Sequence, residues 1–376
     1  MTTTTIPVRK IKVLIVDDSL FMRAAITKTL QSGPFEIVGQ AKDGKSALAE
    51  IARLSPDVVT MDFNMPGMNG ADTVRALMQT RPTPVVMFSA HTKQGARETF
   101  DALAAGAVDF VAKPSGEVSV DLSAIGDELR SKLLAAAGAK PRAARASAMA
   151  ISTAPPLRQS GMIAIPSASG GMPAMTTPTS TGKISRSTLA GALPRIAVIA
   201  VSTGGPAALS EVIPALPADL RCAVIVVQHM PAHFTAALAE RLDAASAVRV
   251  REAQPGDRPL PGVVLIAPGD HHLELDDHGM VLLTDGPLVN GCRPAADVTM
   301  QAAARVYGRR TVGVVMTGMG RDGTAGALAI KAAEGRVCAQ DQLSSVIYGM
   351  PKSAQDAGAV DDVAPLSEIA TWLRNV

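Results

Sequence analysis

Three residues suited to nucleophilic catalysis each follow an apolar run in the second half of the chain. Ser202 follows IAVIAV, His229 follows AVIVVQ, and Asp322 lies in MTGMGRDG after TVGVV. A serine hydroxyl needs a base to attack an ester at neutral pH, and an imidazole needs a carboxylate to hold its tautomer and stabilise its cation. The pattern predicts Ser202 as nucleophile, His229 as general base and then acid, and Asp322 as orienting carboxylate.

Glycines flank the predicted nucleophile and the predicted carboxylate. The segment STGGP at 202–206 predicts a tight turn into a helix that begins near Pro206. The backbone N–H groups of Thr203, in this turn, and of Met319, in TGMG, are candidates to bind the oxyanion that forms in acyl transfer. A serine in such a turn is, by itself, more often a helix cap or part of a phosphate loop, so the prediction depends on its two partners.

A second group of polar residues follows the apolar runs of the N-terminal region. Asp17 and Asp18 follow the first run, and Asp62, Ser89 and Lys113 end three others. Carboxylates that meet at one sheet edge repel one another unless they share a hard cation, and oxygen ligands suit Mg²⁺. A lysine and a small hydroxyl beside them would stabilise phosphoryl oxygens, which predicts Asp62 as a phosphate acceptor.

The first region that must position these residues alternates apolar runs with amphipathic stretches. This βαβ pattern, with nearly continuous apolar runs, predicts a doubly wound α/β domain with a buried five-stranded parallel sheet. Ligands of such a sheet bind at the carboxyl ends of its strands. The apolar runs occupy residues 11–16, 35–41, 56–61, 84–89 and 107–112.

The same alternation returns at Arg195 and predicts a second, Rossmann-like α/β domain with a mainly parallel sheet. Within it, two short alternating segments flank Asp277, His278 and Gly279, which predicts an antiparallel β-hairpin. The expected domains are 1–130 and 193–376, joined by a flexible, disordered linker at 131–192 that is rich in Ala, Ser, Thr and Pro. The apolar runs of the second domain begin at 195, 222, 262, 311 and 336.

Composition excludes several classes of function. A formal net charge of +2 over 376 residues indicates neither a nucleic-acid footprint nor a polybasic membrane anchor. The three cysteines form no C-x-x-C pair, which is typical of a reducing cytoplasm. No apolar run approaches the ~20 residues of a membrane-spanning helix, and the start lacks a signal-peptide core. We therefore expect a cytoplasmic protein without membrane insertion, and a monomer by default.

The first region resembles the receiver domains of two-component response regulators through VDDS (16–19), MDFNMPGMNG (61–70), FSA (88–90) and DFVAKP (109–114). The resemblance implies phosphorylation by a histidine kinase, with Asp62 as acceptor. It also implies that Mg²⁺ is held by Asp17, Asp18, Asp62 and the Asn64 backbone, and that Ser89, Phe110 and Lys113 act as switch residues.

The second region resembles the catalytic domain of the CheB family of chemotaxis methylesterases, over residues 195 to about 362. The motifs are VSTGGP (201–206), VQHMP (227–231), IAPGDHHLEL (266–275), RPAADV (293–298) and MTGMGRDG (316–323). The resemblance implies hydrolysis of γ-glutamyl methyl esters on chemoreceptor helices, and deamidation of receptor glutamines, without a cofactor in this domain. It also implies that phosphorylation of the first domain activates the second.

Two other functions fit parts of the sequence. The second domain would instead bind a partner or nucleic acid without catalysis, but it lacks a recognisable helix-turn-helix and a basic face. STGG would instead be a phosphate loop of a nucleotide-binding domain, but G-x-G-x-x-G and the Walker lysine are both absent. We rank these functions second and third.

Overall fold

The computed structural model describes residues 9–113, 123–139 and 194–376, which form two α/β domains. Most of the linker expected at 131–192 lies outside these residues. Among the described helices, none combines the length and apolar character needed to cross a bilayer.

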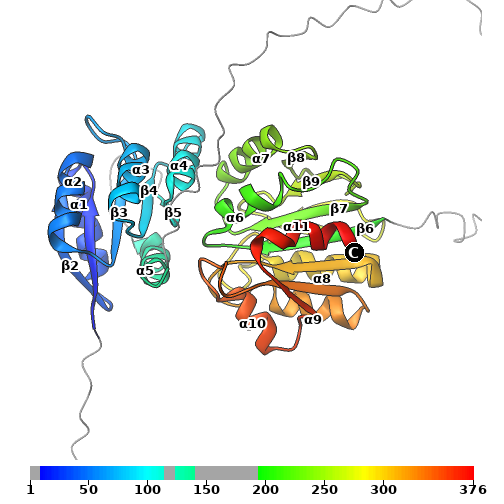
Figure 1. The fold of residues 1–376 in the computed structure, drawn as a ribbon. Helices are drawn as coiled ribbons and strands as arrows, with labels where there is room; N and C mark the ends of the chain where they lie inside the picture. Colours follow the sequence, from blue (N-terminus) through cyan, green and yellow to red (C-terminus); the bar gives the residue numbers. More distant parts are fainter. Residues whose placement is uncertain (1–8, 114–122, 140–193) are drawn as a thin grey trace, which may run out of the picture. The chain divides into compact units, whose positions relative to one another are not determined.

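The first domain is built on a five-stranded parallel sheet in the order β2-β1-β3-β4-β5. Its strands are short apolar segments whose residues are mostly buried, so the predicted doubly wound sheet is confirmed (Figure 1). The strands are β1 Ile11–Val16, β2 Phe35–Ala41, β3 Val58–Asp62, β4 Val85–Ser89 and β5 Asp109–Ala112.

Both faces of this sheet are covered by helices because successive strand side chains alternate between faces. Val13 and Ile15 of β1 pack in one cluster with residues of α1 and α5, whereas Leu14 and Val16 pack in another with residues of α2 and α3. The helices are α1 Leu20–Leu30, α2 Gly44–Leu54, α3 Gly70–Thr80, α4 Lys93–Ala105 and α5 Ser123–Ala137.

The second domain contains a seven-stranded parallel sheet in the order β14-β13-β12-β6-β7-β9-β8. The edge strands β8 and β14 were not predicted from the sequence, because they are short, partly exposed and carry charged residues. The strands are β6 Arg195–Val201, β7 Cys222–Gln228, β8 Arg249–Glu252, β9 Val263–Ile266, β12 Thr311–Val315, β13 Arg336–Gln340 and β14 Asp362–Ala364.

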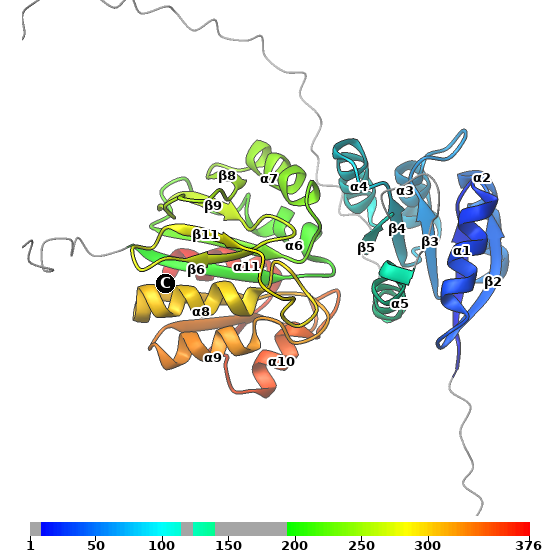
Figure 2. The ribbon, with the colours of Figure 1, turned by 180° about the vertical axis from the view of Figure 1, so that it is seen from behind.

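Helices cover both faces of this second sheet, with α6 and α11 on one face and α8 and α9 on the other (Figures 1 and 2). From β6 the chain winds first to β7 and later to β12 on the other side, so the winding direction reverses between β12 and β6. The helices are α6 Gly205–Val212, α7 Phe234–Ala245, α8 Ala296–Tyr307, α9 Thr324–Ala332, α10 Met350–Asp356 and α11 Leu366–Asn375, with a 3₁₀ turn η1 at Gly308–Arg310.

The predicted antiparallel hairpin is present as β10 His272–Leu275 and β11 Val281–Thr284. Gly279 takes a positive φ of 76° in its turn, where the Asp276 carboxylate accepts hydrogen bonds from the backbone of His278 and Met280. Asp276 and Gly279 therefore account for the sharp reversal.

Helix α5 extends to Ala137, seven residues beyond the domain boundary expected at 130. Its last turns remain helical because Leu133 and Ala136 are fully buried in a core cluster that also contains residues of α1, β4 and β5.

We expect Leu133→Ala to destabilise the first domain by about 2–5 kcal/mol, because it leaves a cavity in this core. The adjacent Leu134 is 50% exposed, so Leu134→Ala should change stability by less than about 0.5 kcal/mol. Hydrogen exchange of the β1 and β4 amides in increasing urea measures both effects. Equal effects of the two substitutions would contradict the placement of this turn.

Candidate active site and phosphoacceptor site

Ser202, His229 and Asp322 lie at the carboxyl ends of three neighbouring strands. Ser202 follows β6, His229 follows β7, and Asp322 follows β12, and β6 lies between the other two strands. This is the point where the winding reverses, which is the usual ligand site of an open α/β sheet. The structure therefore brings together the three residues that the sequence singled out.

The turn after β6 holds Ser202 at the sheet edge. Gly205 N–H donates to Ser202 O at 2.7 Å, and Gly204 has a φ of 79°, which closes the turn tightly. A Cβ atom on Gly318 would lie 2.8 Å from Ser202 Cβ, so only glycine allows the 317–320 loop to approach so closely. Helix α6 begins here, with Pro206 in its first turn as predicted.

Thr317 joins this turn to two other loops. Its carbonyl accepts from Ser202 N–H at 3.0 Å, and its hydroxyl donates to Thr203 O at 3.0 Å. The same hydroxyl oxygen accepts from Ile347 N–H at 3.0 Å. Because Thr317 is fully buried, these bonds fix the loops relative to one another.

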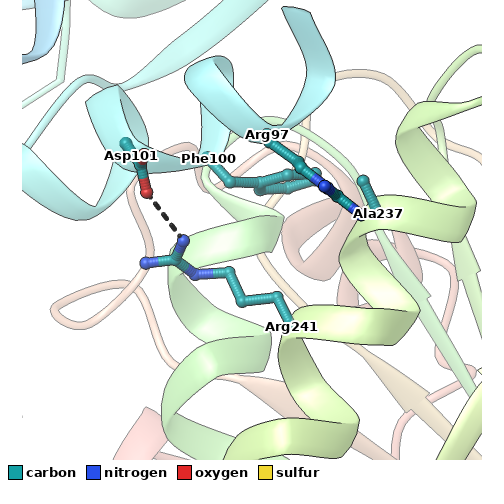
Figure 3. Close-up of a pocket in the computed structure, with 5 residues that line it drawn as sticks. All are labelled: Arg97, Phe100, Asp101, Ala237 and Arg241. Carbon is teal, nitrogen blue, oxygen red and sulfur yellow. Dashed lines mark hydrogen bonds and ion pairs between the residues drawn. The ribbon is translucent and has the colours of Figure 1, made fainter. Parts of the chain in front are cut away.

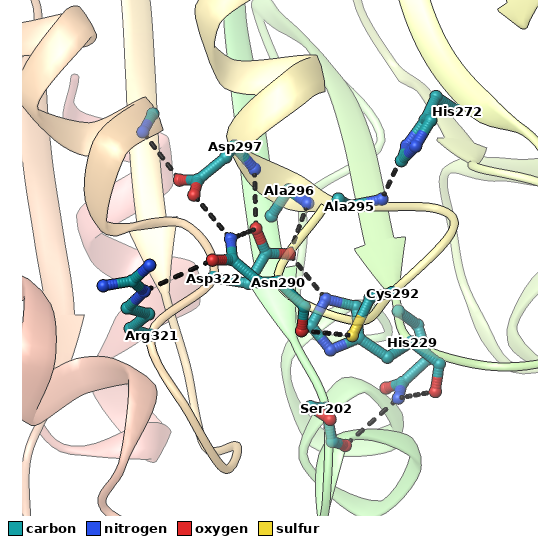
Figure 4. Close-up of polar contacts among 12 residues, drawn as sticks. Ser202, His229, His272, Asn290, Cys292, Ala295, Ala296, Asp297, Arg321 and Asp322 are labelled. Atoms are coloured by element: carbon teal, nitrogen blue, oxygen red, sulfur yellow. Dashed lines mark hydrogen bonds and ion pairs between the residues drawn. The ribbon is translucent and has the colours of Figure 1, made fainter. Parts of the chain in front are cut away.

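His229 and Asp322 form a short hydrogen bond (Figure 4). His229 Nε2 lies 2.6 Å from Asp322 Oδ2, and the two side chains are 11% and 2% exposed. Burial lowers the pKa of His229, but bonds to Asp322 and Cys292 outweigh this effect and raise the pKa to about 10. Because Nε2 faces the carboxylate, a substrate or nucleophile would bind at Nδ1, on a ring that Cys292 also contacts.

The buried carboxylate of Asp322 has four donors. Oδ2 accepts from His229 and from Ala296 N–H at 2.6 Å, while Oδ1 accepts from Asp297 N–H at 3.1 Å. The fourth donor is Asn290 Nδ2, 3.0 Å from Oδ1. Burial raises the pKa of Asp322, but the bonds to His229 and to the α8 N-terminus lower it below its usual value. Asp322 therefore stays ionised.

Asn290 and Asp297 belong to this network, although the sequence motifs did not assign them to it. Asp297 is 6% exposed, and its carboxylate accepts from Gly326 N–H at 2.7 Å and from Asn290 Nδ2 at 2.8 Å. Burial raises the pKa of Asp297, and the charge of Asp322 adds to this rise. The Asn290-Gly291 pair is a turn signal in the sequence, but it does not reveal these contacts.

Three groups near the turn have no hydrogen-bond partner among the described residues. They are the Ser202 hydroxyl and the backbone N–H groups of Thr203 and Met319. An open hydroxyl and two open donors beside a histidine could accommodate a carbonyl substrate. The buried Gln228 supports the turn from below, since its Nε2 donates to Ser202 O at 3.1 Å and to His229 O at 3.2 Å.

The acidic cluster of the first domain also forms as predicted from the sequence. Carboxylate oxygens of Asp17, Asp18 and Asp62 lie within 4.8 Å of one another. Lys113 Nζ lies 2.9 Å from Asp62 and 3.3 Å from Asp17. Burial raises the pKa of both Asp17 and Asp62, and Lys113 opposes this rise. This set of oxygen donors fits a hard divalent cation.

The other predicted residues of this domain lie on β4, on β5 and in the loop after β3. Asn64 follows Asp62 by two residues, and its side chain donates to Glu98 at 3.2 Å. The buried Ser89 hydroxyl accepts from Thr99 at 2.6 Å and donates to Gly95 O at 3.2 Å. Phe110 is 2% exposed.

Helices α4 and α7 carry two exposed ion pairs. Arg241 lies 3.1 Å from Asp101, and Arg97 lies 3.1 Å from Glu240. Figure 3 shows the first pair beside Phe100. Exposed pairs of this kind each contribute about 0–1 kcal/mol, so neither is a strong determinant of stability.

Comparison with known proteins assigns each of the two domains to a family. Residues 197–373 match the model of the CheB methylesterase family, and residues 13–122 match the response regulator receiver domain. The chain is 46% identical to a protein-glutamate methylesterase/protein-glutamine glutaminase of Symbiobacterium thermophilum, over 96% of each chain. The chain belongs to the CheB methylesterase family.

Two further proteins are similar to this chain. A protein of the same name from Pyrococcus horikoshii is 42% identical, over 96% of this chain and 92% of its own. The crystal structure of the Thermotoga maritima CheB methylesterase catalytic domain is 44% identical, covers 48% of this chain and 97% of its own, and has a TM-score of 0.47.

We expect Asp322→Asn to lower the pKa of His229, because the ring cation loses its carboxylate partner. NMR titration of the His229 ring should show protonation persisting into alkaline solution in the unsubstituted protein and ending at lower pH in the variant. Asp285→Asn is the control, because Asp285 bonds His271 and not His229. An unchanged His229 titration in Asp322→Asn would contradict the observed pair.

Proposed function

We propose that this CheB-family hydrolase removes methyl groups from γ-glutamyl methyl esters of chemoreceptors and deamidates receptor glutamines, using Ser202, His229 and Asp322. The observation that carries the proposal is the buried His229–Asp322 pair beside the open hydroxyl of Ser202. The curated relatives, which match over nearly their full length, are named for these two activities.

In the proposed first half-reaction, Ser202 Oγ attacks the ester carbonyl and His229 takes the hydroxyl proton. The tetrahedral intermediate then collapses, and His229 gives this proton to the departing methoxide, which leaves as methanol. In the second half-reaction, water attacks the acyl-enzyme, His229 takes a proton from the water and returns it to Ser202, and glutamate is released. A glutamine substrate would release ammonia in place of methanol.

The His229–Asp322 bond gives this mechanism a pH dependence. His229 must be neutral to accept a proton, and Asp322 raises its pKa by stabilising the cation. A raised pKa makes His229 a stronger base, but it also reduces the neutral fraction at a given pH. The rate should therefore rise with pH through the pKa of His229.

The N–H groups of Thr203 and Met319 are the proposed donors to the oxyanion. Both lie in loops that Thr317 fixes, so they need no rearrangement as charge develops on the carbonyl oxygen.

We expect Met319→Pro to lower kcat by about 10²–10³-fold, because it removes one such N–H donor. Met319→Ala keeps the N–H and is the matched control, which should retain kcat within a few-fold. The measurement is kcat of the two variants with methylated receptor as substrate. Equal turnover by the two folded variants would exclude the Met319 N–H as a donor.

In the receiver domain, Asp62 is the proposed phosphoacceptor. A bound Mg²⁺, held by Asp17, Asp18, Asp62 and the Asn64 backbone, would neutralise charge on the phosphoryl oxygens. Lys113 is placed to pair with a phosphoryl oxygen, and the Ser89 hydroxyl can turn from Gly95 O toward the same group. With Phe110, these are the proposed switch residues through which phosphorylation activates the hydrolase.

The partners follow from these roles. A histidine kinase would donate the phosphoryl group, and the cytoplasmic helices of methylated receptors would be the substrate. We propose that the protein acts in the cytoplasm as a monomer, without nucleic acid, membrane insertion or a cofactor in its second domain.

We expect Ser202→Ala to reduce methanol release from methylated receptor membranes by at least about 10³-fold, because the nucleophile is lost. Release by the unsubstituted chain should increase with a small phosphodonor and Mg²⁺. Asp62→Asn should keep basal release but lose this stimulation.

Ser210→Ala is the matched serine control, because the Ser210 hydroxyl donates to the Pro206 carbonyl within α6 and lies outside the site. Release that does not depend on Ser202 would exclude the proposed nucleophile. The absence of release under all conditions would favour a second domain that binds a partner without catalysis.

A further inference from the structure

Asn290 occupies a tight turn next to the two buried carboxylates. Val289 and Cys292 exchange two backbone hydrogen bonds of 3.1 and 2.9 Å around the turn. The two central residues, Asn290 and Gly291, have φ values of 52° and 78°. Asn-Gly is the favoured pair for a turn with two positive φ angles. Turn geometry therefore accounts for an asparagine here, but not for where its side chain points.

The side chain of Asn290 reaches from this exposed turn to both acids (Figure 4). Its Nδ2 donates to Asp297 Oδ2 at 2.8 Å and to Asp322 Oδ1 at 3.0 Å, so both amide protons are used. Its Oδ1 accepts from Arg321 Nε at 3.3 Å, which fixes the amide with its donors toward the acids.

The two acids that share this amide have different roles. Asp322 uses its other oxygen for His229, whereas Asp297 uses its other oxygen for the α9 backbone at Gly326. Two neighbouring carboxylates tend to share a proton, which would weaken the bond from Asp322 to His229. An amide NH₂ between them supplies two donors and accepts no proton, so it allows both carboxylates to remain ionised.

We propose that Asn290 is a positioning residue for the reaction, which holds the Asp322 carboxylate toward His229 and prevents it from sharing a proton with Asp297. The inference rests on the proposed Ser202, His229 and Asp322 mechanism. The titratable or charged groups around this amide are His229, Cys292, Asp297, Arg321 and Asp322.

Two substitutions test the amide without disturbing the turn. Asn290→Gly removes the side chain, and Asn290→Asp replaces the NH₂ donor with an acceptor, while Gly-Gly and Asp-Gly both suit a turn with positive φ angles. In each variant we expect kcat for methylated receptor to fall by about 10–100-fold with KM changed less than about twofold. In Asn290→Gly the acid limb of the kcat profile should move to lower pH, because a less well held Asp322 supports the His229 cation less.

A purely structural role would lower the amount of folded enzyme, measured by circular dichroism, and would leave the shape of the pH profile unchanged. Wild-type kcat and pH profile in either folded variant would overturn the inference, and so would lost activity with an unshifted profile in Asn290→Gly. If Asn290→Gly does not fold, the test rests on kcat of Asn290→Asp: a fall supports the inference, and an unchanged kcat overturns it. Ser202→Ala is assayed in parallel: if it retains activity, the proposed mechanism itself fails, whereas an inactive Ser202→Ala confines any failure to Asn290.

Discussion

The second domain depends on keeping one buried carboxylate ionised. Asp322 is 2% exposed, and an unpaired charge at that depth would cost several kcal/mol, so its donors constrain much of the surrounding structure. Two donors come from the first turn of α8, one from the turn at Asn290 and one from His229 after β7. Moving any of these elements would remove a donor from the charge. The geometry of the proposed active site and the packing of α8 beside β6 and β12 therefore both depend on this charge.

The first domain meets a related requirement in a different way. Its carboxylates also gather at the carboxyl edge of a parallel sheet, but the charge that faces Asp17 and Asp62 is the ammonium of Lys113. Each of these two carboxylates accepts one backbone hydrogen bond, from Ser19 N–H and Phe63 N–H respectively. A flexible lysine can exchange partners when a phosphoryl group arrives, whereas helix N–H groups cannot move independently. The difference suits a site that changes charge in one domain and a site that must keep a fixed geometry in the other.

The sequence predicts residues that lie at the carboxyl ends of strands. It is less informative about contacts between elements that are far apart along the chain. Ser202 and His229 were candidates because each directly follows a buried apolar run, and Asp322 because it lies in the loop after another such run. Parallel strands end at a common edge, so the sequence predicted that these residues would lie close together. The edge strands β8 and β14 were missed because three or four partly charged residues carry no clear alternation. Asn290 gave only a turn signal, since its acid partners are 7 and 32 residues away and meet it only after α8 and the 317–323 loop have packed. The boundary expected at 130 falls within α5, whose final turn is rich in alanine and therefore gave no clear helical signal.

The pairing of Asp297 with Asp322 explains why two neighbouring acids acquire opposite properties. Asp322 precedes α9 and binds the N-terminus of α8, whereas Asp297 lies in the first turn of α8 and binds the N-terminus of α9. The N-terminus of each helix thus stabilises the acid that lies at the N-terminus of the other helix. The arrangement is asymmetric because Asp322 accepts from His229 and from two backbone N–H groups of α8, whereas Asp297 accepts from one backbone N–H of α9. These bonds lower the pKa of Asp322, while burial raises the pKa of Asp297. An imidazole next to either acid would favour the ionised form of that acid. His229 follows β7 and lies next to Asp322, so Asp322 is the carboxylate proposed to orient the base.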